Sequence, residues 1–442
     1  MDTPLGEFGD KRLQAISVLL MERLLTVGQS GVSVRKLGGN RAGELRLGHL
    51  LHSPKVKTAT MIETAFTRTA AHVNGRRILI AQDTTSLRDD GTRHSHQLHA
   101  AIALDAESGA LIGLVHASFH RRAGGQKASC GKRLFADKES RRWLDAIEAS
   151  GRLAEAGAAA TTAVGDAECD IYDVFARRPA SVEMVVRAHH DRVLADETRL
   201  FAATEAVADW GHESIELPAN PGRAARRATL ALKAVAVTIS RPKRNTAAEM
   251  AGLPPEQRLW LVEAREVDVP VGATAAHWRL LTTQPVTTLA EARRVCAIYR
   301  QRWTIEQLFR TMKTKGFDIE AVRVVEPKPF ETLAAAILIA AVQVLQMVRE
   351  RDGAAKRPQT DVFEAEDQPV LEALCTQLQG KTDRQKNPHP SGSLAYATWV
   401  CARLGGWTGY YGSPGPVVIL GGMLRFQAIK EGWKLHEIGR IL

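Results

Sequence analysis

The sequence contains little cysteine and no paired cysteine motif. The chain has 442 residues, and its five cysteines stand far apart, without a CxxC pair: Cys130, Cys169, Cys296, Cys375 and Cys401. This spacing supports neither a zinc knuckle nor a disulfide framework. We therefore expect a reducing compartment, the cytoplasm.

Targeting and membrane-spanning signals are also missing. The first residues, MDTPLGEFGDKRLQ, contain no apolar h-region of a signal peptide. The longest apolar run, residues 332–348, is short for a membrane span and is interrupted by Gln343 and Gln346. The sequence therefore predicts that the protein has no membrane partner.

Acidic residues are fewer than basic ones. The chain has 49 Asp and Glu against 59 Lys and Arg, which gives a formal net charge of +10. Such a surplus favours a polyanionic partner, and nucleic acid comes before a membrane surface. Hydrophobic residues make up 45% of the sequence, so the chain has room for two or three domains with a sizeable core.

The hydrophobic pattern predicts an α/β protein in five parts. These are a helical N-terminal region, the first part of an α/β core, an antiparallel β-rich insertion, the second part of the core, and a helical C-terminal region: 1–75, 76–191, 192–286, 287–350 and 351–442. The N-terminal region is basic, which suits DNA binding as well as a solvated helical cap. Within the first part of the core the expected order is strand, strand, strand, helix, strand, helix, strand. That order matches a mixed sheet of the ribonuclease H type.

Residues 299–313, YRQRWTIEQLFRTMK, are predicted to form one helix with a polar stripe. Tyr299, Arg302, Glu306 and Lys313 are three, four and seven positions apart, so they return to one helix face. A second face is apolar and would dock on a core: Ile305, Leu308, Phe309 and Met312. An acid between two cations suits a site where a metal ion and phosphates meet. A solvated face with ordinary ion pairs fits the same spacing.

Two aspartates follow predicted strands. Asp83 comes directly after the strand predicted at 77–82, and Asp166 after the strand predicted at 161–165. Ligands in open α/β sheets bind just beyond the carboxyl ends of strands. Two or three carboxylates converging there, with Glu306 as the third, can hold two Mg²⁺ ions about 4 Å apart for phosphodiester chemistry. Either aspartate alone is equally explained as a turn or helix-cap residue, so the set of three is the informative signal.

Four blocks together resemble the DDE transposases of bacterial insertion sequences, the insertion-sequence-four family, and more closely the transposon-five type. They are AQDTTSL at 81–87, VGDAECDIYDVF at 164–175, the Y-x2-R-x3-E-x6-K signature within 299–313, and ARLGGW at 402–407. Smaller matches are KESRRWLDAIEAS, VVRAHH and WRLLTTQPV, at 138–150, 185–190 and 278–286. The blocks extend over nearly the whole chain in the expected order.

The resemblance implies a ribonuclease H-like mixed-sheet catalytic core interrupted by an antiparallel β insertion. It implies that Asp83, Asp166 and Glu306 are the catalytic, metal-binding triad, with two Mg²⁺ ions per active site and Mn²⁺ as a substitute. The implied activity is cut-and-paste transposition in a bacterial cytoplasm, on the nucleoid. The implied partners are double-stranded DNA, both transposon ends and target, and a second copy in a synaptic homodimer. The C-terminal region would form that dimer, although its apolar residues fit packing on their own core equally well.

The resemblance also implies which residues contact DNA. Tyr299, Arg302 and Lys313 would bind phosphates of the transposon end near the scissile bond. Trp278 matches a position whose indole stacks on a flipped base, although a structural tryptophan on a β surface fits as well. Arg187 is a further expected phosphate contact.

Two departures from the family pattern leave another function open. Ala167 stands where close relatives have an arginine after the catalytic aspartate. The block LGEFGDKRL begins at Leu5, whereas a longer end-binding stretch precedes it in close relatives. The alternatives to an active transposase are a truncated or domesticated, non-catalytic DNA-binding inhibitor and a stand-alone metal nuclease.

Overall fold

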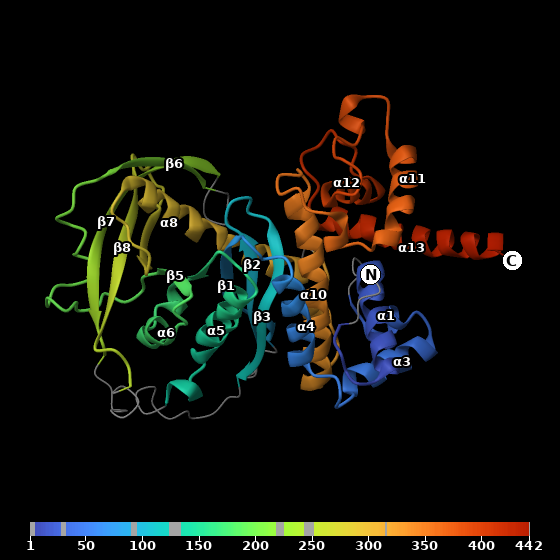
Figure 1. The fold of residues 1–442 in the computed structure, drawn as a ribbon, viewed down its shortest axis with the longest axis horizontal. Coiled ribbons are helices and arrows are strands. Elements are labelled where there is room, and N and C mark those ends of the chain that lie inside the picture. Colours follow the sequence, from blue (N-terminus) through green and yellow to red (C-terminus); the bar gives the residue numbers. More distant parts are fainter. Residues whose placement is uncertain are drawn as a thin grey trace. The chain divides into compact units, whose positions relative to one another are not determined.

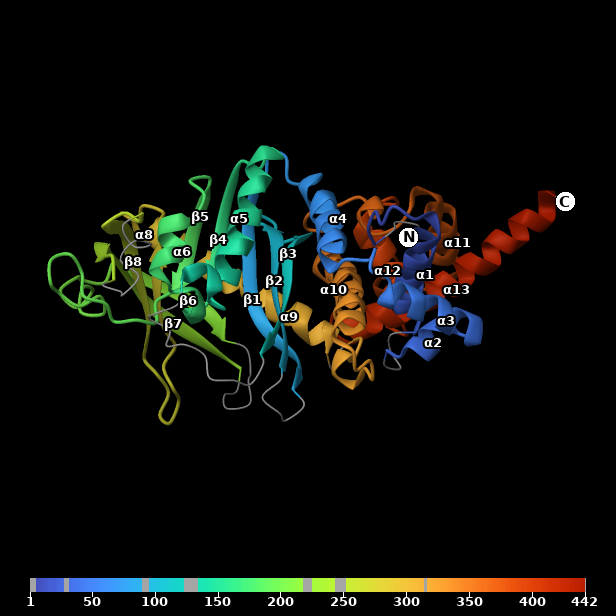
Figure 2. The same cartoon turned by 90° about the horizontal axis from the view of Figure 1, so that it is seen from below.

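The structure, a computed structural model, describes residues 5–27, 32–89, 95–122, 134–217, 225–242, 252–313 and 316–441. The chain forms two compact units (Figures 1 and 2). Unit 1 comprises Met1–Val73, Thr84–Ala123 and Thr304–Leu442, and unit 2 comprises Asn74–Asp83 and Gly124–Trp303. The division into five sequence parts stays a prediction.

Unit 2 is built on a mixed sheet. Its strands are β4 (Ala160–Gly165), β5 (Val182–Arg187), β6 (Gly211–Leu217), β7 (Arg226–Ser240), β8 (Glu256–Val267), β9 (His277–Thr282) and residues 77–83 of β1 (Arg77–Asp89). Strand β4 pairs in parallel with β1 and β5, while the β5–β9, β9–β8, β8–β7 and β7–β6 pairs are antiparallel. Helices α5 (Arg141–Glu155), α6 (Tyr172–Arg177) and α8 (Leu289–Gln301) belong to the same unit, and both α5 and α8 pack on β4 and β5.

The rest of β1 belongs to unit 1, together with β2 (Ser95–Asp105) and β3 (Leu111–Arg122). The predicted turn of the β2–β3 hairpin is confirmed, because Asp105 Oδ1 accepts hydrogen bonds from the Glu107 and Ser108 backbone N–H groups at 3.0 and 2.8 Å. The strand order is β3-β2-β1-β4-β5-β9-β8-β7-β6. A mixed α/β protein with helical N- and C-terminal regions is thus confirmed, and the sheet is consistent with a ribonuclease H-like core.

The β-rich insertion is antiparallel, as predicted, and it extends the core sheet. Strand β9 pairs with β5 through Val185 and Thr282, Val186 and Leu281, and Arg187 and Leu280. The insertion therefore continues the hydrogen-bond ladder at the edge that β5 would otherwise expose. This placement brings the sequence around Trp278 beside the end of β5.

Unit 1 is otherwise helical. Its N-terminal helices are α1 (Lys11–Val27), α2 (Val34–Gly38), α3 (Arg41–His52) and α4 (Thr58–Ala70). Its later helices are α9 (Trp303–Met312), α10 (Pro327–Glu350), α11 (Gln368–Leu378), α12 (Leu394–Leu404) and α13 (Pro416–Ile441). The first residue of α9, Trp303, belongs to unit 2. In Figure 2 the end of α13 projects away from the other helices of unit 1.

Helix α10 is the central helix of unit 1. It packs on β3, α4, α12 and α13 (Figure 1). Its length and composition are sufficient for a membrane span, which the sequence did not predict, but 89% of its most apolar stretch is buried inside the protein. Burial by protein on all sides explains an apolar sequence that is continuous rather than confined to one stripe.

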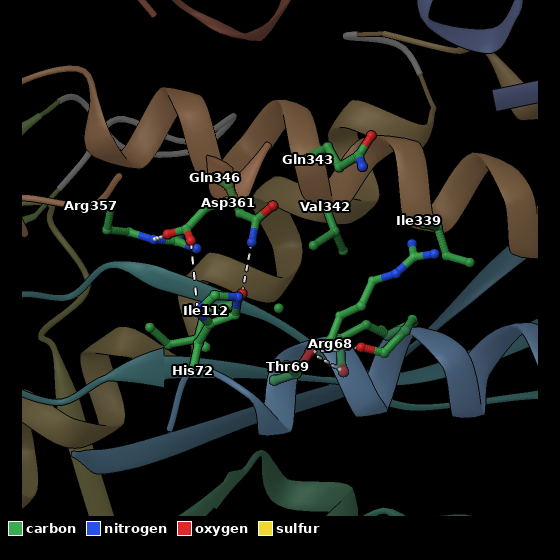
Figure 3. A pocket seen from close by; sticks show the side chains of 13 residues that line it. Arg68, Thr69, His72, Ile112, Ile339, Val342, Gln343, Gln346, Arg357 and Asp361 are labelled. Carbon is green, nitrogen blue, oxygen red and sulfur yellow. Dashed lines mark hydrogen bonds and ion pairs between the residues drawn. The ribbon is translucent and has the colours of Figure 1, made fainter. Parts of the chain in front are cut away.

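A small cavity of about 70 Å³, lined by both polar and apolar side chains, lies between α10, α4 and β3 (Figure 3). Gln346 Nε2 donates to the Ile112 carbonyl at 2.7 Å, which uses one of the two glutamines that interrupt the apolar run. At one end, Arg357 and Asp361 form an ion pair of 2.6 Å, with side chains only 3% and 4% exposed. His72 Nδ1 lies 3.7 Å from Asp361 Oδ1. The Gln346 hydrogen bond joins α10 to β3, and the contact of Asp361 with His72 joins the segment after α10 to the residues after α4.

Candidate active site

Asp83 and Asp166 lie at the same level of two neighbouring parallel strands. The β1–β4 register ends at Ala81 opposite Val164, and each aspartate lies two residues further along its own chain. Since paired strands are about 5 Å apart, the backbones of the two aspartates are neighbours. One prediction was wrong: β1 continues to Asp89, so Asp83 lies within the strand, whereas Asp166 does follow the end of β4.

The turn after β4 fixes Asp166. Its side chain accepts a hydrogen bond from the Glu168 N–H at 2.8 Å and caps the short 3₁₀ helix Ala167–Cys169. A Cβ on Gly165 would lie 2.5 Å from the Cys169 Cβ, so only glycine lets the chain turn back this tightly. Glu168 is held in turn by Arg142, at 2.9 Å. An arginine thus supports this block from α5, although the position after Asp166 is an alanine.

Arg302 forms an ion pair with Asp83 inside unit 2. Its Nη1 lies 2.7 Å from Asp83 Oδ2, and the two side chains are 14% and 16% exposed. The sequence assigned these residues to different partners, Arg302 to a DNA phosphate and Asp83 to a metal ion. In this structure the two residues instead contact each other, and the positive guanidinium balances the negative charge of the carboxylate.

The YRQRW segment is not one continuous helix, which corrects the sequence prediction. Helix α8 ends at Gln301, Arg302 is its C-cap, and α9 begins at Trp303. Tyr299 is 8% exposed on α8, whereas Trp303 is 41% exposed at the start of α9. A break of one residue leaves the spacing of apolar residues almost unchanged, so periodicity does not reveal it.

Trp278 and Tyr299 pack together. Their ring centroids are 5.9 Å apart with an angle of 60° between the planes. Trp278 lies in β9 opposite Ala264, and Arg187, at the end of β5, pairs with Leu280 two residues further along β9. Because the Tyr299 ring is buried, its expected contact with a phosphate would be made through the hydroxyl.

Arg187 is exposed, and the chain that follows it is fixed by a residue the sequence analysis did not single out. Asp170, 1% exposed, accepts hydrogen bonds from the His189 and His190 N–H groups at 2.8 and 3.0 Å. Its other oxygen lies 2.7 Å from Arg192 Nη2. The blocks VGDAECD and VVRAHH, in which the bonded residues are 19 and 20 positions apart, meet through this carboxylate. In the sequence, only the presence of both blocks pointed to this contact of Asp170.

Glu306 and Lys313 belong to unit 1. Glu306 lies in the first turn of α9, and Lys313 follows its last residue and pairs with Glu320 at 3.1 Å. The apolar face of α9 is confirmed, since its four members are all buried: Ile305, Leu308, Phe309 and Met312. The amphipathic pattern thus placed the docking side of this helix correctly.

The donor chemistry of the two aspartates fits a divalent metal ion. Carboxylate oxygens are the ligands that Mg²⁺ and Mn²⁺ prefer, and Asp83 and Asp166 offer them at one level of the sheet. Within the described part of the chain, no three His, Cys, Asp or Glu side chains are gathered into a group able to hold a metal ion. Asp83 and Asp166 would supply two of the ligands of such an ion, and Arg302 would have to leave Asp83 for it to bind.

Comparison with known families gives one result. A family described as "Transposase DDE domain" matches residues 59–343, well over half of the chain. The match includes both aspartates, the insertion, Glu306 and Lys313.

Proposed function

The chain belongs to the transposase DDE domain family, and from that premise we propose that it is a cut-and-paste DNA transposase of the transposon-five type. Family membership implies a transposase-related function, DNA binding and polynucleotidyl transfer, and DDE transposases generally use divalent metal ions. The observation that supports catalysis is the shared register level of Asp83 and Asp166.

In this proposal Asp83, Asp166 and Glu306 would hold two Mg²⁺ or Mn²⁺ ions, which would lower the pKa of the attacking hydroxyl and stabilise the leaving oxygen. Water hydrolyses one phosphodiester at each transposon end and releases a 3′-hydroxyl. That hydroxyl attacks the opposite strand and forms a hairpin, water reopens the hairpin, and the 3′ ends then attack target DNA. Each attack forms one P–O bond and breaks one, so no further co-reactant is required.

The remaining residues would bind DNA. Arg302, Lys313 and Arg187 are cations suited to phosphate oxygens. Trp278, packed against Tyr299, offers an indole for a base flipped during hairpin formation. We place the reaction in a bacterial cytoplasm, on the nucleoid, in a synaptic homodimer.

The Arg302–Asp83 ion pair also favours a second candidate function. A guanidinium that holds a partly buried aspartate suits a structural carboxylate as well as a catalytic one. The protein would then be a non-catalytic, transposase-derived protein that binds DNA or inhibits an active relative.

The test is cleavage, in Mg²⁺, of a duplex that carries the flanking inverted repeat, followed by transfer of the cut strand into a plasmid target. We expect the natural chain to cleave and transfer. Glu306→Ala should abolish cleavage but retain DNA binding, because this carboxylate serves the metal ion and not the DNA backbone. Glu107→Ala removes an exposed acid in the β2–β3 turn and is the matched control.

Normal cleavage by Glu306→Ala would contradict the metal assignment. Binding of the inverted repeat without cleavage by the natural chain would favour the non-catalytic function. Cleavage without strand transfer would indicate a metal nuclease.

A further inference from the structure

A cavity of about 320 Å³ opens in unit 1, beside α12. Its walls come from α12 itself, the loops before and after it, and the residues that follow α10. The proposed transposition chemistry uses none of them. The volume falls within the usual range of small-ligand sites, about 300–1,000 Å³.

Two tryptophans line this cavity. Trp399 is 4% exposed, and Trp407 is held in place because its Nε1 donates to the Gly412 carbonyl at 2.9 Å. The Arg403 guanidinium lies 5.6 Å from the Trp399 ring centroid and steadies that ring. Fixed indoles offer flat apolar surfaces, on which a planar aromatic group stacks without ordering flexible side chains.

The charges around the cavity leave one positive charge in excess. Lys386 pairs with Asp383 at 3.2 Å, and Arg351 lies 3.8 Å from Asp352. Arg384 lines the same cavity and has no ion-pair partner among the described residues; its guanidinium lies 6.0 Å from the Tyr410 ring centroid. One unpaired guanidinium matches the single negative charge of a phosphodiester group.

A buried hydroxyl with no partner within the described chain belongs to the wall of this cavity. Thr398 lines the cavity, is 1% exposed, and its Oγ1 has no hydrogen-bond partner within the described chain. A helical threonine normally returns its hydroxyl to the carbonyl one turn back. An unsatisfied buried polar group costs free energy in the empty protein, and a ligand that pairs with it recovers that cost. A hydroxyl both donates and accepts, as the polar edge of a nucleobase requires.

Burial lowers the pKa of His389, another residue of this wall, so at neutral pH its imidazole adds no charge. The lining thus combines two indoles, one unpaired cation and one unpaired hydroxyl. We propose that the cavity binds one unpaired nucleotide, with its base against Trp399 and Trp407, its polar edge at Thr398 Oγ1, and its phosphate at Arg384.

The proposal rests on the proposed function only for the source of that nucleotide, which is a DNA strand with an extruded or single-stranded base. A free mononucleotide offers the same chemistry. A base stacked inside a duplex does not, because it would have to leave the stack first.

The experiment uses the full chain in EDTA, so that no strand is cleaved. The probes are dAMP, a labelled single-stranded oligonucleotide and the corresponding blunt duplex, followed by tryptophan fluorescence and anisotropy. Arg384→Ala and Thr398→Val should each weaken binding of the single-stranded probe about tenfold. Lys381→Ala, an exposed cation of the same loop outside the cavity wall, should leave affinity within about twofold.

Thermal melting separates binding from folding. Thr398→Val removes a hydroxyl that lacks a partner, so its melting temperature should equal or exceed that of the natural protein. Weaker binding by a variant of undiminished stability therefore reports the ligand contact. Single-strand binding at least tenfold tighter than dAMP binding identifies a DNA strand as the source, while equal affinities identify the free nucleotide.

The proposal is overturned if neither dAMP nor the single strand binds at millimolar concentration, or if both cavity variants bind like the natural protein. Cleavage of the inverted-repeat duplex in Mg²⁺ is measured separately. Nucleotide binding without cleavage would contradict only the proposed function. Cleavage without nucleotide binding would contradict only this proposal.

Discussion

Replacing Arg302 by glutamine should tighten metal binding while destabilising the metal-free protein. Arg302 Nη1 and Asp83 Oδ2 are 2.7 Å apart, and both side chains are about five-sixths buried. For unit charges at that distance, an effective dielectric constant of about 20 gives roughly 6 kcal/mol of attraction. Removing two charges from water offsets much of this attraction, and loss of one partner from a buried ion pair costs about 3–5 kcal/mol; for this partly exposed pair we use the lower value, about 3 kcal/mol.

A metal ion that takes Asp83 must displace this guanidinium. Arg302→Gln removes the competitor, so the affinity for Mn²⁺ should rise by up to about a hundredfold, the equivalent of about 3 kcal/mol. The free energy of unfolding without metal should fall by a similar amount, because a largely buried carboxylate loses its cation. Both effects come from the same contact.

Calorimetric titration of Mn²⁺ into DNA-free protein measures the first quantity, and urea denaturation in EDTA measures the second. Arg300→Gln, an exposed arginine two residues earlier on α8, is the matched control and should change neither. Asp83→Asn should abolish the Mn²⁺ signal. If Arg302→Gln binds Mn²⁺ no better than the natural protein, or if Asp83→Asn binds it normally, Asp83 is not the metal ligand that Arg302 protects.

Three further predictions test other parts of the structure. Asp361→Ala should lower the free energy of unfolding by about 3–5 kcal/mol in chemical denaturation, since it leaves Arg357 buried without its ion pair. Burial opposes ionisation of Glu263, yet hydrogen bonds, first that of Thr204, hold its pKa below the ordinary 4.5. A lowered pKa stabilises the fold above pH 4.5, and this stability is lost as the pH falls further. In Glu263→Gln the free energy of unfolding should therefore fall less as the pH is lowered below 4.5. Urea denaturation midpoints measured at several pH values test this. Lys313→Ala should weaken binding of transposon-end DNA and reduce the slope of log affinity against log salt concentration by about one. An unchanged slope would contradict a phosphate contact at Lys313.

The local chemistry of this chain is readable from its sequence. Strand and helix order in 76–191 followed from the hydrophobic period, and the buried face of α9 followed from helical spacing. Asp83 and Asp166 were singled out because each directly follows a predicted strand, although β1 in fact continues past Asp83. These signals are local, because they depend on neighbours within one or two turns or one strand.

Other features required the folded chain. The break at Arg302 leaves the apolar spacing intact, so no periodicity shows it. The contact of Arg302 with Asp83 joins residues 219 positions apart, and the carboxylate of Asp170 joins two blocks at the end of β5. Such contacts form only after the sheet has brought remote segments together, so the sequence leaves them open.

The sequence by itself determined which residues are able to do chemistry: the acids, the cations spaced along residues 299–313, and the apolar faces that bury their neighbours. The tertiary structure decided which of them meet. Charge and hydrogen-bond partners are chosen by distance in space, and the register of β1 on β4 and the pairing of β9 with β5 set those distances. The same reason explains the cavity beside α12. Its residues Arg384, Thr398, Trp399 and Trp407 belong to no common sequence motif, and only the folded chain brings them together around one cavity.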